Sequence, residues 1–211
     1  MFMGKQKQKI RREKLERQYK SIARTRSILS AAESEKALIP KAPDHKPLVN
    51  NLVHVFVDDQ NIFWDIVNNH SGIGYRIDFG KLLLAASDNE RGVGTAFIAG
   101  VVPDDDSFWQ IAKNQGFEVK RGYIGANNRS KQDDAYLVTE MTKTIYEKKG
   151  PSTIVLVAGD ADYYPPLLNA IEKGWRVEVI HVSNKNVSSR LEPVCHRFLK
   201  IAPESIRFIS Q

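Results

Sequence analysis

The sequence predicts an α/β fold: a doubly wound, mostly parallel sheet with helices on both faces, preceded by a basic helical arm. Three observations support this prediction. Strand-length apolar segments alternate with helical segments, which indicates a parallel sheet. Several strand segments are unbroken runs of Val, Ile and Leu, as in strands buried on both faces. The basic residues concentrate before the first strand. We therefore expect a basic helical arm with a Pro-containing linker at 1–47 and one α/β domain at 48–211.

The arm differs from the rest of the chain in charge. Residues 1–36 contain eleven Lys or Arg and four Glu, a net charge of +7, whereas the whole chain carries +6. Residues 5–30 lack Pro and Gly, and a narrow apolar stripe at helical spacing consists of Leu15, Tyr19 and Ile22. Three interpretations stay open: the arm contacts nucleic acid or an acidic partner, it is an ordinary solvated helix, or its apolar stripe docks on a partner or on the body of the chain.

The prolines of the linker predict its stiffness, and the remaining composition indicates the cellular compartment. The linker contains three prolines, Pro40, Pro43 and Pro47, and is therefore expected to be stiff. The single cysteine, Cys195, excludes an internal disulfide framework and suits a reducing compartment. The first residues do not resemble a signal peptide, and no apolar run approaches the roughly 20 residues that span a bilayer. We expect a soluble cytoplasmic protein that does not bind membranes.

The expected elements follow one another along the body. Apolar runs next to Gly, Pro or Asp predict strands at 52–57, 95–102, 117–124, around 154 and at 175–182, with an edge strand at 198–201. Helical spacing predicts helices at 60–69, 78–87 (with Asp78 as cap), 104–115, 131–149 and 165–173, and a short one near 188. This order gives the alternation on which the fold prediction depends.

Carboxylates follow two of the predicted strands. Asp160 and Asp162 come directly after the strand around 154, and Asp58 and Asp59 come after the first strand. The carboxyl ends of parallel strands are where open α/β sheets bind ligands. In an extended segment, residues two apart point the same way, so Asp160 and Asp162 are expected to face one spot. Close carboxylates repel unless a cation lies between them, and a hard divalent cation prefers oxygen ligands. Polar turns with helix-capping acids are the ordinary alternative for each pair alone.

The long helix at 131–149 offers a further acid. Its expected core-facing stripe contains Leu137, Val138, Met141 and Ile145. Asp134 shares that stripe at helical spacing, whereas Asp133 is turned by about 100° and is expected to face solvent. An acid on the buried face needs a partner, while the helix dipole alone explains an exposed acid in the first turn. We therefore select Asp134 as the functional acid. Three separate segments then deliver carboxylates to one edge.

The motifs that carry these acids resemble a known family. They are Phe56-Val57-Asp58-Asp59-Gln60-Asn61, Lys131-Gln132-Asp133-Asp134 and Ala158-Gly159-Asp160-Ala161-Asp162-Tyr163. From about 52 to 201 the chain looks like an NYN domain of the LabA-like branch of the PIN-like nuclease superfamily. The resemblance implies a PIN-like, Rossmannoid three-layer sandwich.

The sequence also departs from the pattern of this family. Asp59 replaces a usual Gly, and Gln132 and Asp133 stand where a Gly and an apolar residue are common. Residues 188–191 resemble the C-terminal Ser-x-x-Leu of the family, but His196 stands where an acid is often found.

The resemblance and the acid pattern together predict a metal-dependent ribonuclease. A carboxylate set holding Mg²⁺ or Mn²⁺ would activate a water for attack on a phosphodiester of RNA, which we expect to be single-stranded. The predicted metal ligands are Asp58, Asp134, Asp160 and Asp162. The catalytic set adds Asn61, which would hold a metal-bound water or a phosphate oxygen. Candidate phosphate contacts are Arg121, Arg129 and Lys131, and Trp64 and Tyr163 either stack on bases or belong to the core.

Three other functions compete with this one. A receiver domain would use Asp58 and Asp59 for Mg²⁺ and Asp104 as phosphoacceptor, but leaves Asp134, Asp160 and Asp162 unexplained. A haloacid-type phosphohydrolase needs Asp-x-Asp after the first strand, which this chain lacks. A catalytically weak NYN-like module that binds RNA or a protein without cutting stays open as the alternative.

Overall fold

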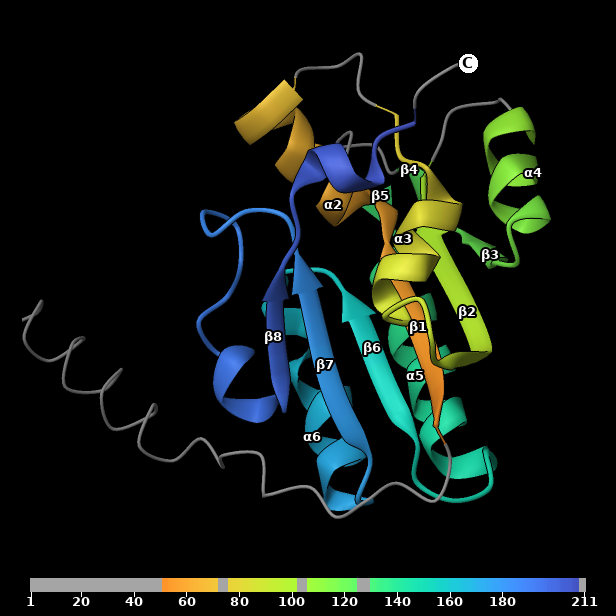
Figure 1. Cartoon of the computed structure of the whole chain (residues 1–211), viewed down its shortest axis with the longest axis vertical. Helices are drawn as coiled ribbons and strands as arrows, with labels where there is room; N and C mark the ends of the chain where they lie inside the picture. The colour runs from red at the N-terminus through yellow and green to blue at the C-terminus, as the bar shows by residue number, and fades with distance from the viewer. Residues whose placement is uncertain (1–50, 72–75, 102–105, 125–129, 209–211) are drawn as a thin grey trace, which may run out of the picture. The chain divides into compact units, whose positions relative to one another are not determined.

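The computed structural model describes residues 51–71, 76–101, 106–124 and 130–208, so the predicted arm and linker at 1–47 lie outside the described residues. The described chain is built on a six-stranded sheet in the order β3-β2-β1-β6-β7-β8, in which every neighbouring pair is parallel (Figure 1). The strands are β1 (Leu52–Asp58), β2 (Gly92–Gly100), β3 (Glu118–Arg121), β6 (Thr153–Val157), β7 (Arg176–His181) and β8 (Arg197–Lys200). The α/β fold with a doubly wound parallel sheet is thus confirmed.

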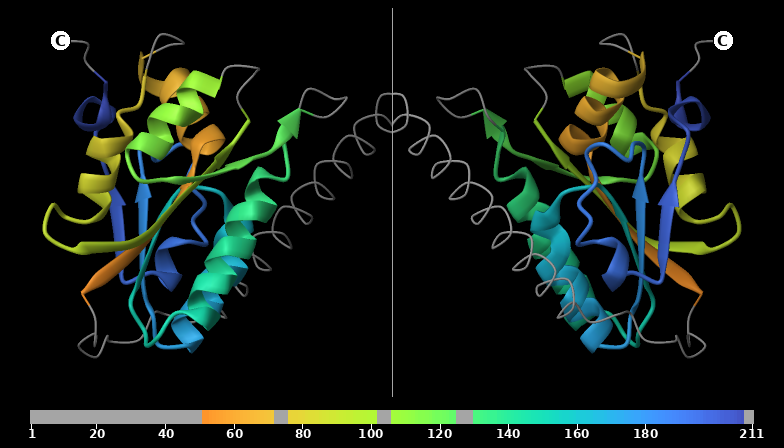
Figure 2. Two further views of the ribbon diagram at one scale, coloured as in Figure 1. Left: turned by 90° about the vertical axis from the view of Figure 1, so that its right-hand side faces the viewer. Right: turned by 90° about the vertical axis from the view of Figure 1, so that its left-hand side faces the viewer.

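Helices cover both faces of this sheet (Figure 2). One core cluster joins the sheet to α2 (Asp59–Ile66), α3 (Phe79–Ala86) and α4 (Asp106–Asn114). The other joins it to α5 (Asp133–Glu147) and α6 (Tyr164–Glu172). A π-helical turn, η1 (Val67–Ser71), extends α2, and short 3₁₀ helices form η2 (Ala161–Tyr163), η3 (Glu192–Val194) and η4 (Pro203–Ile206). No helix in the described part of the chain is long and apolar enough to cross a membrane.

The central strand shows why the sequence produces this layering. Successive side chains of a strand point to opposite faces. Val55 and Val57 of β1 join the cluster under α2, α3 and α4, whereas Phe56 joins the cluster under α5 and α6. All three are fully buried, which is why the run is apolar without alternation. Burying side chains of this size stabilises the fold by about 1.5–3 kcal/mol each.

The predicted cap of α3 is observed, whereas several predicted boundaries differ from the observed ones. The carboxylate of Asp78 caps α3 by accepting a hydrogen bond from the backbone N–H of Lys81 at 3.1 Å. The strand expected at 117–124 is divided at Gly122, whose N–H donates to the carbonyl of Gly100. Beyond it, β4 (Tyr123–Ile124) pairs antiparallel with β5 (Ser130–Lys131), which the periodicity did not predict. The helix expected near 188 is instead a turn followed by η3.

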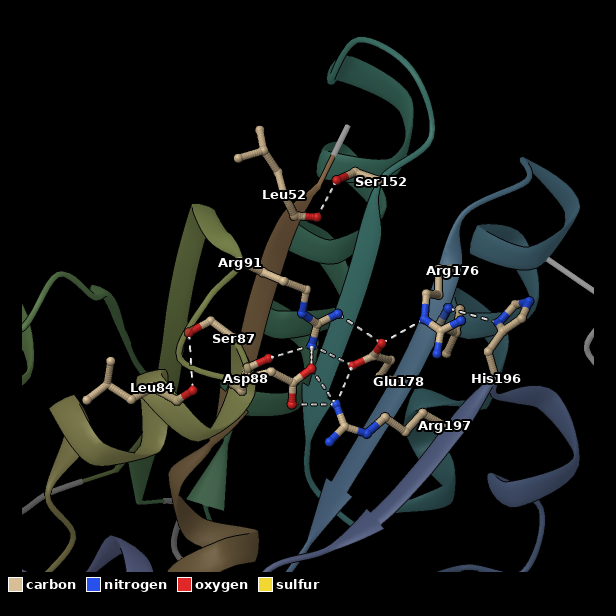
Figure 3. A network of polar contacts seen from close by, with 12 residues as sticks. Leu52, Leu84, Ser87, Asp88, Arg91, Ser152, Arg176, Glu178, His196 and Arg197 are labelled. Atoms are coloured by element: carbon tan, nitrogen blue, oxygen red, sulfur yellow. Dashed lines mark hydrogen bonds and ion pairs between the residues drawn. The ribbon is translucent and has the colours of Figure 1, made fainter. Parts of the chain in front are cut away.

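A buried ionic network lies on the sheet away from the strands' carboxyl ends (Figure 3). Glu178 of β7 is 2% exposed, and its carboxylate accepts hydrogen bonds from Arg91 at 2.8 and 2.9 Å and from Arg176 at 2.7 Å. Arg197 lies 3.5 Å from the same carboxylate and pairs with Asp88 at 2.7 Å. Burial alone raises the pKa of Glu178, but the hydrogen bonds from Arg91 and Arg176 hold that pKa below its usual value. This carboxylate is therefore neutralised by the chain itself.

Candidate metal centre

Three carboxylates meet where the carboxyl end of β1 faces the amino end of α5. Asp58 ends β1, and Asp133 and Asp134 form the first turn of α5. One oxygen of each lies within 4.8 Å of those of the other two. Asp58 and Asp133 are buried and Asp134 is half-buried. We call Asp58, Asp133 and Asp134 the acid cluster. No described Lys or Arg side chain forms an ion pair with any of them.

The hydroxyl of Tyr163 joins two members of the acid cluster. Its oxygen lies 2.9 Å from Oδ2 of Asp58 and 3.1 Å from Oδ1 of Asp134, and the side chain is fully buried. A phenol carries one hydrogen, so Tyr163 donates to one carboxylate or is shared between both. The core interpretation of Tyr163 is thus confirmed, and its stacking on bases is excluded by burial. The hydroxyl fixes the separation of Asp58 and Asp134.

The electrostatics of the acid cluster favour a bound proton or cation. The pKa of Asp58 is raised to about 7, chiefly by burial and further by the negative charge of Asp134. The backbone N–H of Asn61, which donates to Oδ1 of Asp58 at 2.9 Å, opposes this increase. Burial is also the largest cause of the raised pKa of Asp134, and the negative charge of Asp133 raises that pKa further. A set of carboxylate oxygens with no positive partner in the described chain fits a hard divalent cation such as Mg²⁺ or Mn²⁺. Asp58, Asp133 and Asp134 are the residues that would hold it.

The position of Asp133 differs from the one that the sequence predicted. Asp133 is only 3% exposed, so the expectation that it faces solvent is wrong. The buried residues of α5 are Asp133, Leu137, Met141, Thr144 and Ile145, and Val138 is only partly buried. Counting Val138 as a full member rotated the predicted stripe toward Asp134. The actual stripe passes through Asp133, and Asp134 flanks it, so both acids reach the same place.

Asp160 and Asp162 occupy the exposed rim beside the acid cluster. Asp160 is the N-cap of η2, where its Oδ1 accepts the backbone N–H of Asp162 at 3.1 Å. The segment is a 3₁₀ turn rather than an extended strand, so strand alternation does not give the two side chains a shared direction. The charge of Asp160 contributes to the raised pKa of Asp134, after burial and Asp133, which places it near the cluster. The ligand roles of Asp160 and Asp162 stay predictions.

Asn61 connects the two strand ends that carry the acids. Its side-chain oxygen accepts the backbone N–H of Gly159 at 2.8 Å, which links α2 to the residue before Asp160. Gly159 has no room for a side chain, because a Cβ atom there would lie 2.7 Å from the carbonyl oxygen of Asn186. Asn61 therefore positions the edge of the site. Its predicted contact with a water or a phosphate stays a prediction.

The remaining candidates are distributed around this edge. Trp64 of α2 is 51% exposed and donates from its indole N–H to Gln60 at 3.0 Å, so it is not a core residue. Arg121 is exposed at the end of β3, whereas Arg129 and the side chain of Lys131 lie outside what the structure describes. Asp59, at the departure from the family pattern, is buried, and burial raises its pKa to about 7.

The comparisons with known proteins agree with this geometry. The profile of the NYN domain family matches residues 53–202, which is most of the chain. The chain belongs to the NYN domain family. NYN domains form a PIN-like nuclease family, so the acid cluster lies in a domain of nuclease type. No curated protein matches the chain.

A solved structure has the same fold as this NYN domain. The crystal structure of a protein of unknown function from Vibrio parahaemolyticus superimposes with a TM-score of 0.61 at 20% sequence identity. The match covers 79% of this chain and 99% of that one. At this identity the similarity establishes the fold alone.

Proposed function

We propose that the NYN domain is a metal-dependent ribonuclease that hydrolyses phosphodiester bonds of single-stranded RNA. The observation that carries the proposal is the acid cluster of Asp58, Asp133 and Asp134, which is buried without a cationic partner in the described chain. Burying like charges together is costly unless a ligand compensates for them. Membership of a nuclease-type family supports the same function.

Each side chain has a proposed role at this site. Asp58, Asp133 and Asp134 would hold the cation, and Asp160 and Asp162 would be further ligands, directly or through water. A bound Mg²⁺ or Mn²⁺ would supply an activated water and neutralise charge on the departing oxygen. Tyr163 holds Asp58 and Asp134 at a fixed separation, and Asn61 holds Gly159, the residue before Asp160. The preorganised edge thus orients a phosphodiester for in-line attack.

The test is cleavage of end-labelled single-stranded RNA by the purified full chain. We expect cleavage with Mg²⁺ or Mn²⁺, none in excess chelator, and none for Asp160→Asn. That substitution retains the shape of the side chain, and its Oδ1 can still accept the N–H of Asp162. Cleavage that persists in chelator, or full activity of Asp160→Asn, contradicts the metal mechanism.

A module that binds RNA without cutting it is the second candidate. The observation that favours it is that Asp160 and Asp162 are exposed and not part of the closely spaced acid cluster. The same assay separates the two functions when binding is measured in parallel. Metal-dependent RNA binding with intact label in every condition would support the binding module and contradict the nuclease.

A further inference from the structure

Three exposed aromatic side chains lie around the acid cluster. Trp64 of α2 is 51% exposed, Tyr123 of β4 is 54% exposed and Tyr136 of α5 is 38% exposed. The segments α2, β4 and β5 lie at the same end of the sheet, where β1 ends at Asp58 (Figure 1). A single exposed ring needs no explanation, but rings from three segments beside one site indicate a contact with a ligand.

The indole of Trp64 is restricted by its neighbours on α2. Its N–H donates to the side-chain oxygen of Gln60 at 3.0 Å, and the side-chain nitrogen of Gln60 donates to the carbonyl of Val101 at 2.9 Å. The ring also packs edge-on against Phe63, with 5.4 Å between the ring centres. Trp64 follows Asp58, the N-cap of α2, by six residues, or about 9 Å along the helix axis. Stacking on this ring therefore costs little further side-chain entropy.

The pairing of β4 with β5 brings Tyr123 close to the same carboxylates. Tyr123 pairs with Lys131, which precedes Asp133 by two residues. One step across an antiparallel pair and two steps along the chain limit the distance between the Cα atoms of Tyr123 and Asp133 to about 13 Å. The preceding residue, Gly122, donates its N–H to the carbonyl of Gly100 at 3.1 Å. Tyr123 therefore lies at the carboxyl end of β2, close to the acid cluster.

Tyr136 is in the first turn of α5, three residues after Asp133. It shares a side of this helix with Glu140, because residues four apart are neighbours on a helix surface. The carboxylate of Glu140 lies 3.3 Å from the ammonium group of Lys120 in β3. The side of α5 that carries Tyr136 is therefore the side next to β3. Tyr136 and the segment that leads to Tyr123 thus meet the acid cluster from the same direction.

These rings fit the unpaired bases of a single strand. The bases of a duplex stack on one another, whereas an unpaired base has a free aromatic face that stacks on Trp or Tyr. We propose that Trp64, Tyr123 and Tyr136 form an aromatic platform that stacks bases of a single-stranded nucleic acid on the β2–β3 side of the acid cluster. Every base has such a face, so the platform selects single strands over duplexes without selecting a sequence. This inference rests on the proposed function.

The first test is tryptophan fluorescence, because Trp64 is the one exposed tryptophan of the three in the chain. Trp109 and Trp175 are only 1% and 2% exposed. We would titrate the full-length Asp160→Asn protein, as the parent, with oligouridine in Mg²⁺. Bases that stack on Trp64 should quench the emission, and Trp64→Phe should abolish the quenching while binding persists, since phenylalanine retains an aromatic face.

The second test is affinity, measured by the anisotropy of labelled oligonucleotides over a range of salt concentrations. Trp64→Ala and Tyr123→Ala should each weaken the binding of oligouridine by about 5- to 150-fold, which corresponds to one stacked base. The slope of log affinity against log salt should not change, because neither ring neutralises a phosphate. An oligonucleotide with abasic sugars in place of the bases should bind the parent and both variants equally.

The chain supplies a matched control at the other end of α5. Tyr146 is 59% exposed near the C-terminal end of this helix. Tyr146→Ala should leave both the affinity for oligouridine and the quenching unchanged.

Three results overturn the aromatic platform while RNA binding by the parent stands. They are binding without quenching, full affinity of Trp64→Ala and Tyr123→Ala, and an equal loss for Tyr146→Ala or for the abasic strand. The second result would assign the rings to a protein partner instead. A parent that binds no RNA overturns the proposed function together with the platform.

Discussion

Two regions of the NYN domain bury carboxylates in opposite ways. Three arginines, Arg91, Arg176 and Arg197, surround the buried Glu178, and two of them also pair with Asp88 (Figure 3). In the acid cluster, Asp58 and its neighbours on α5 face one another and neutral donors such as the hydroxyl of Tyr163, with no cation among the described residues. The pKa of Glu178 is lowered, whereas burial raises that of Asp58 to about 7. The difference teaches that the first region is neutralised within the described chain, while the second has the charge that the cation of the proposed function would neutralise.

The largest expected effect comes from removing the charge of Glu178, the buried acid of the ionic network. Glu178→Gln leaves three arginines without their shared anion, and removing one partner of a buried ion pair costs about 3–5 kcal/mol of folding free energy. The matched change, Asp58→Asn, removes a repelling charge and retains an oxygen that can accept the N–H of Asn61. Urea unfolding of the metal-free proteins should show a large loss of stability for Glu178→Gln and none for Asp58→Asn. An equal loss in both would mean that the two regions do not differ.

The next effect concerns the two acids of α5. Asp133→Asn and Asp134→Asn should each lower the rate of RNA cleavage by at least about 100-fold, since residues that only support metal ligands already contribute 10–100-fold. Helical periodicity alone predicted that Asp133 is dispensable, so this prediction depends on the observed burial. Single-turnover cleavage at fixed Mg²⁺ measures it, with Glu147→Gln at the exposed C-terminal end of α5 as control. Full activity of Asp133→Asn would limit the cluster to Asp58 and Asp134.

A third effect follows from pH. The pKa of Asp59 is raised by burial from 3.8 to about 7, so the folded protein binds that proton more tightly than the unfolded chain. Ionisation of Asp59 therefore reduces the stability of the parent as pH rises from about 4 through 7. Asp59→Asn removes this loss, so its stability relative to the parent should be greater at pH 8 than at pH 5, by about 1–3 kcal/mol at 1.36 kcal/mol per pKa unit.

The unfolding experiment for Asp59 has to compare the metal-free variant with the metal-free parent at each pH. Burial lowers the pKa of His54 to about 4, so this histidine adds stability as pH rises toward 6.5 and opposes the slope from Asp59. The difference between the two proteins removes the contribution of His54. A difference that is the same at both pH values contradicts the raised pKa.

The smallest effect removes one atom between two acids. Tyr163→Phe deletes the hydroxyl that lies 2.9 Å from Asp58 and 3.1 Å from Asp134. Loss of a partner that orients metal ligands should weaken Mn²⁺ affinity by about tenfold. Calorimetric titration with Mn²⁺ reads this directly, and thermal unfolding of the metal-free protein shows whether the core is intact. Unchanged affinity would assign Tyr163 a packing role only.

The features that the sequence predicts are those set by local pattern. The apolar run of β1 ends at an acid, and this position at a strand's carboxyl end placed Asp58 without knowledge of its neighbours. Asp78 was predictable in the same way, as an acid just before an apolar helix. Such features depend on a few adjacent residues.

What the sequence did not predict depends on contacts between distant segments. Asp133 was misplaced because the phase of α5 is fixed by what it packs against, and a partly buried Val138 distorted the periodicity. The hydroxyl of Tyr163 reaches Asp58 across 105 residues, and Arg91 reaches Glu178 across 87. No spacing rule along the chain indicates either contact. The 3₁₀ turn after Asp160 likewise replaced the extended backbone that alternation assumed.

The most direct measurement is the stabilisation of the protein by Mn²⁺. A ligand that binds only the folded state at 100 times its Kd adds about 2.7 kcal/mol to the free energy of unfolding. Urea unfolding at pH 8, with and without Mn²⁺, should show a gain of this size for the parent. The control Arg197→Ala changes the ionic network around Glu178 and should show the same gain. The gain should be absent in Asp134→Asn. No gain in the parent, or an equal gain in Asp134→Asn, would contradict the claim that the acid cluster is completed by a divalent cation.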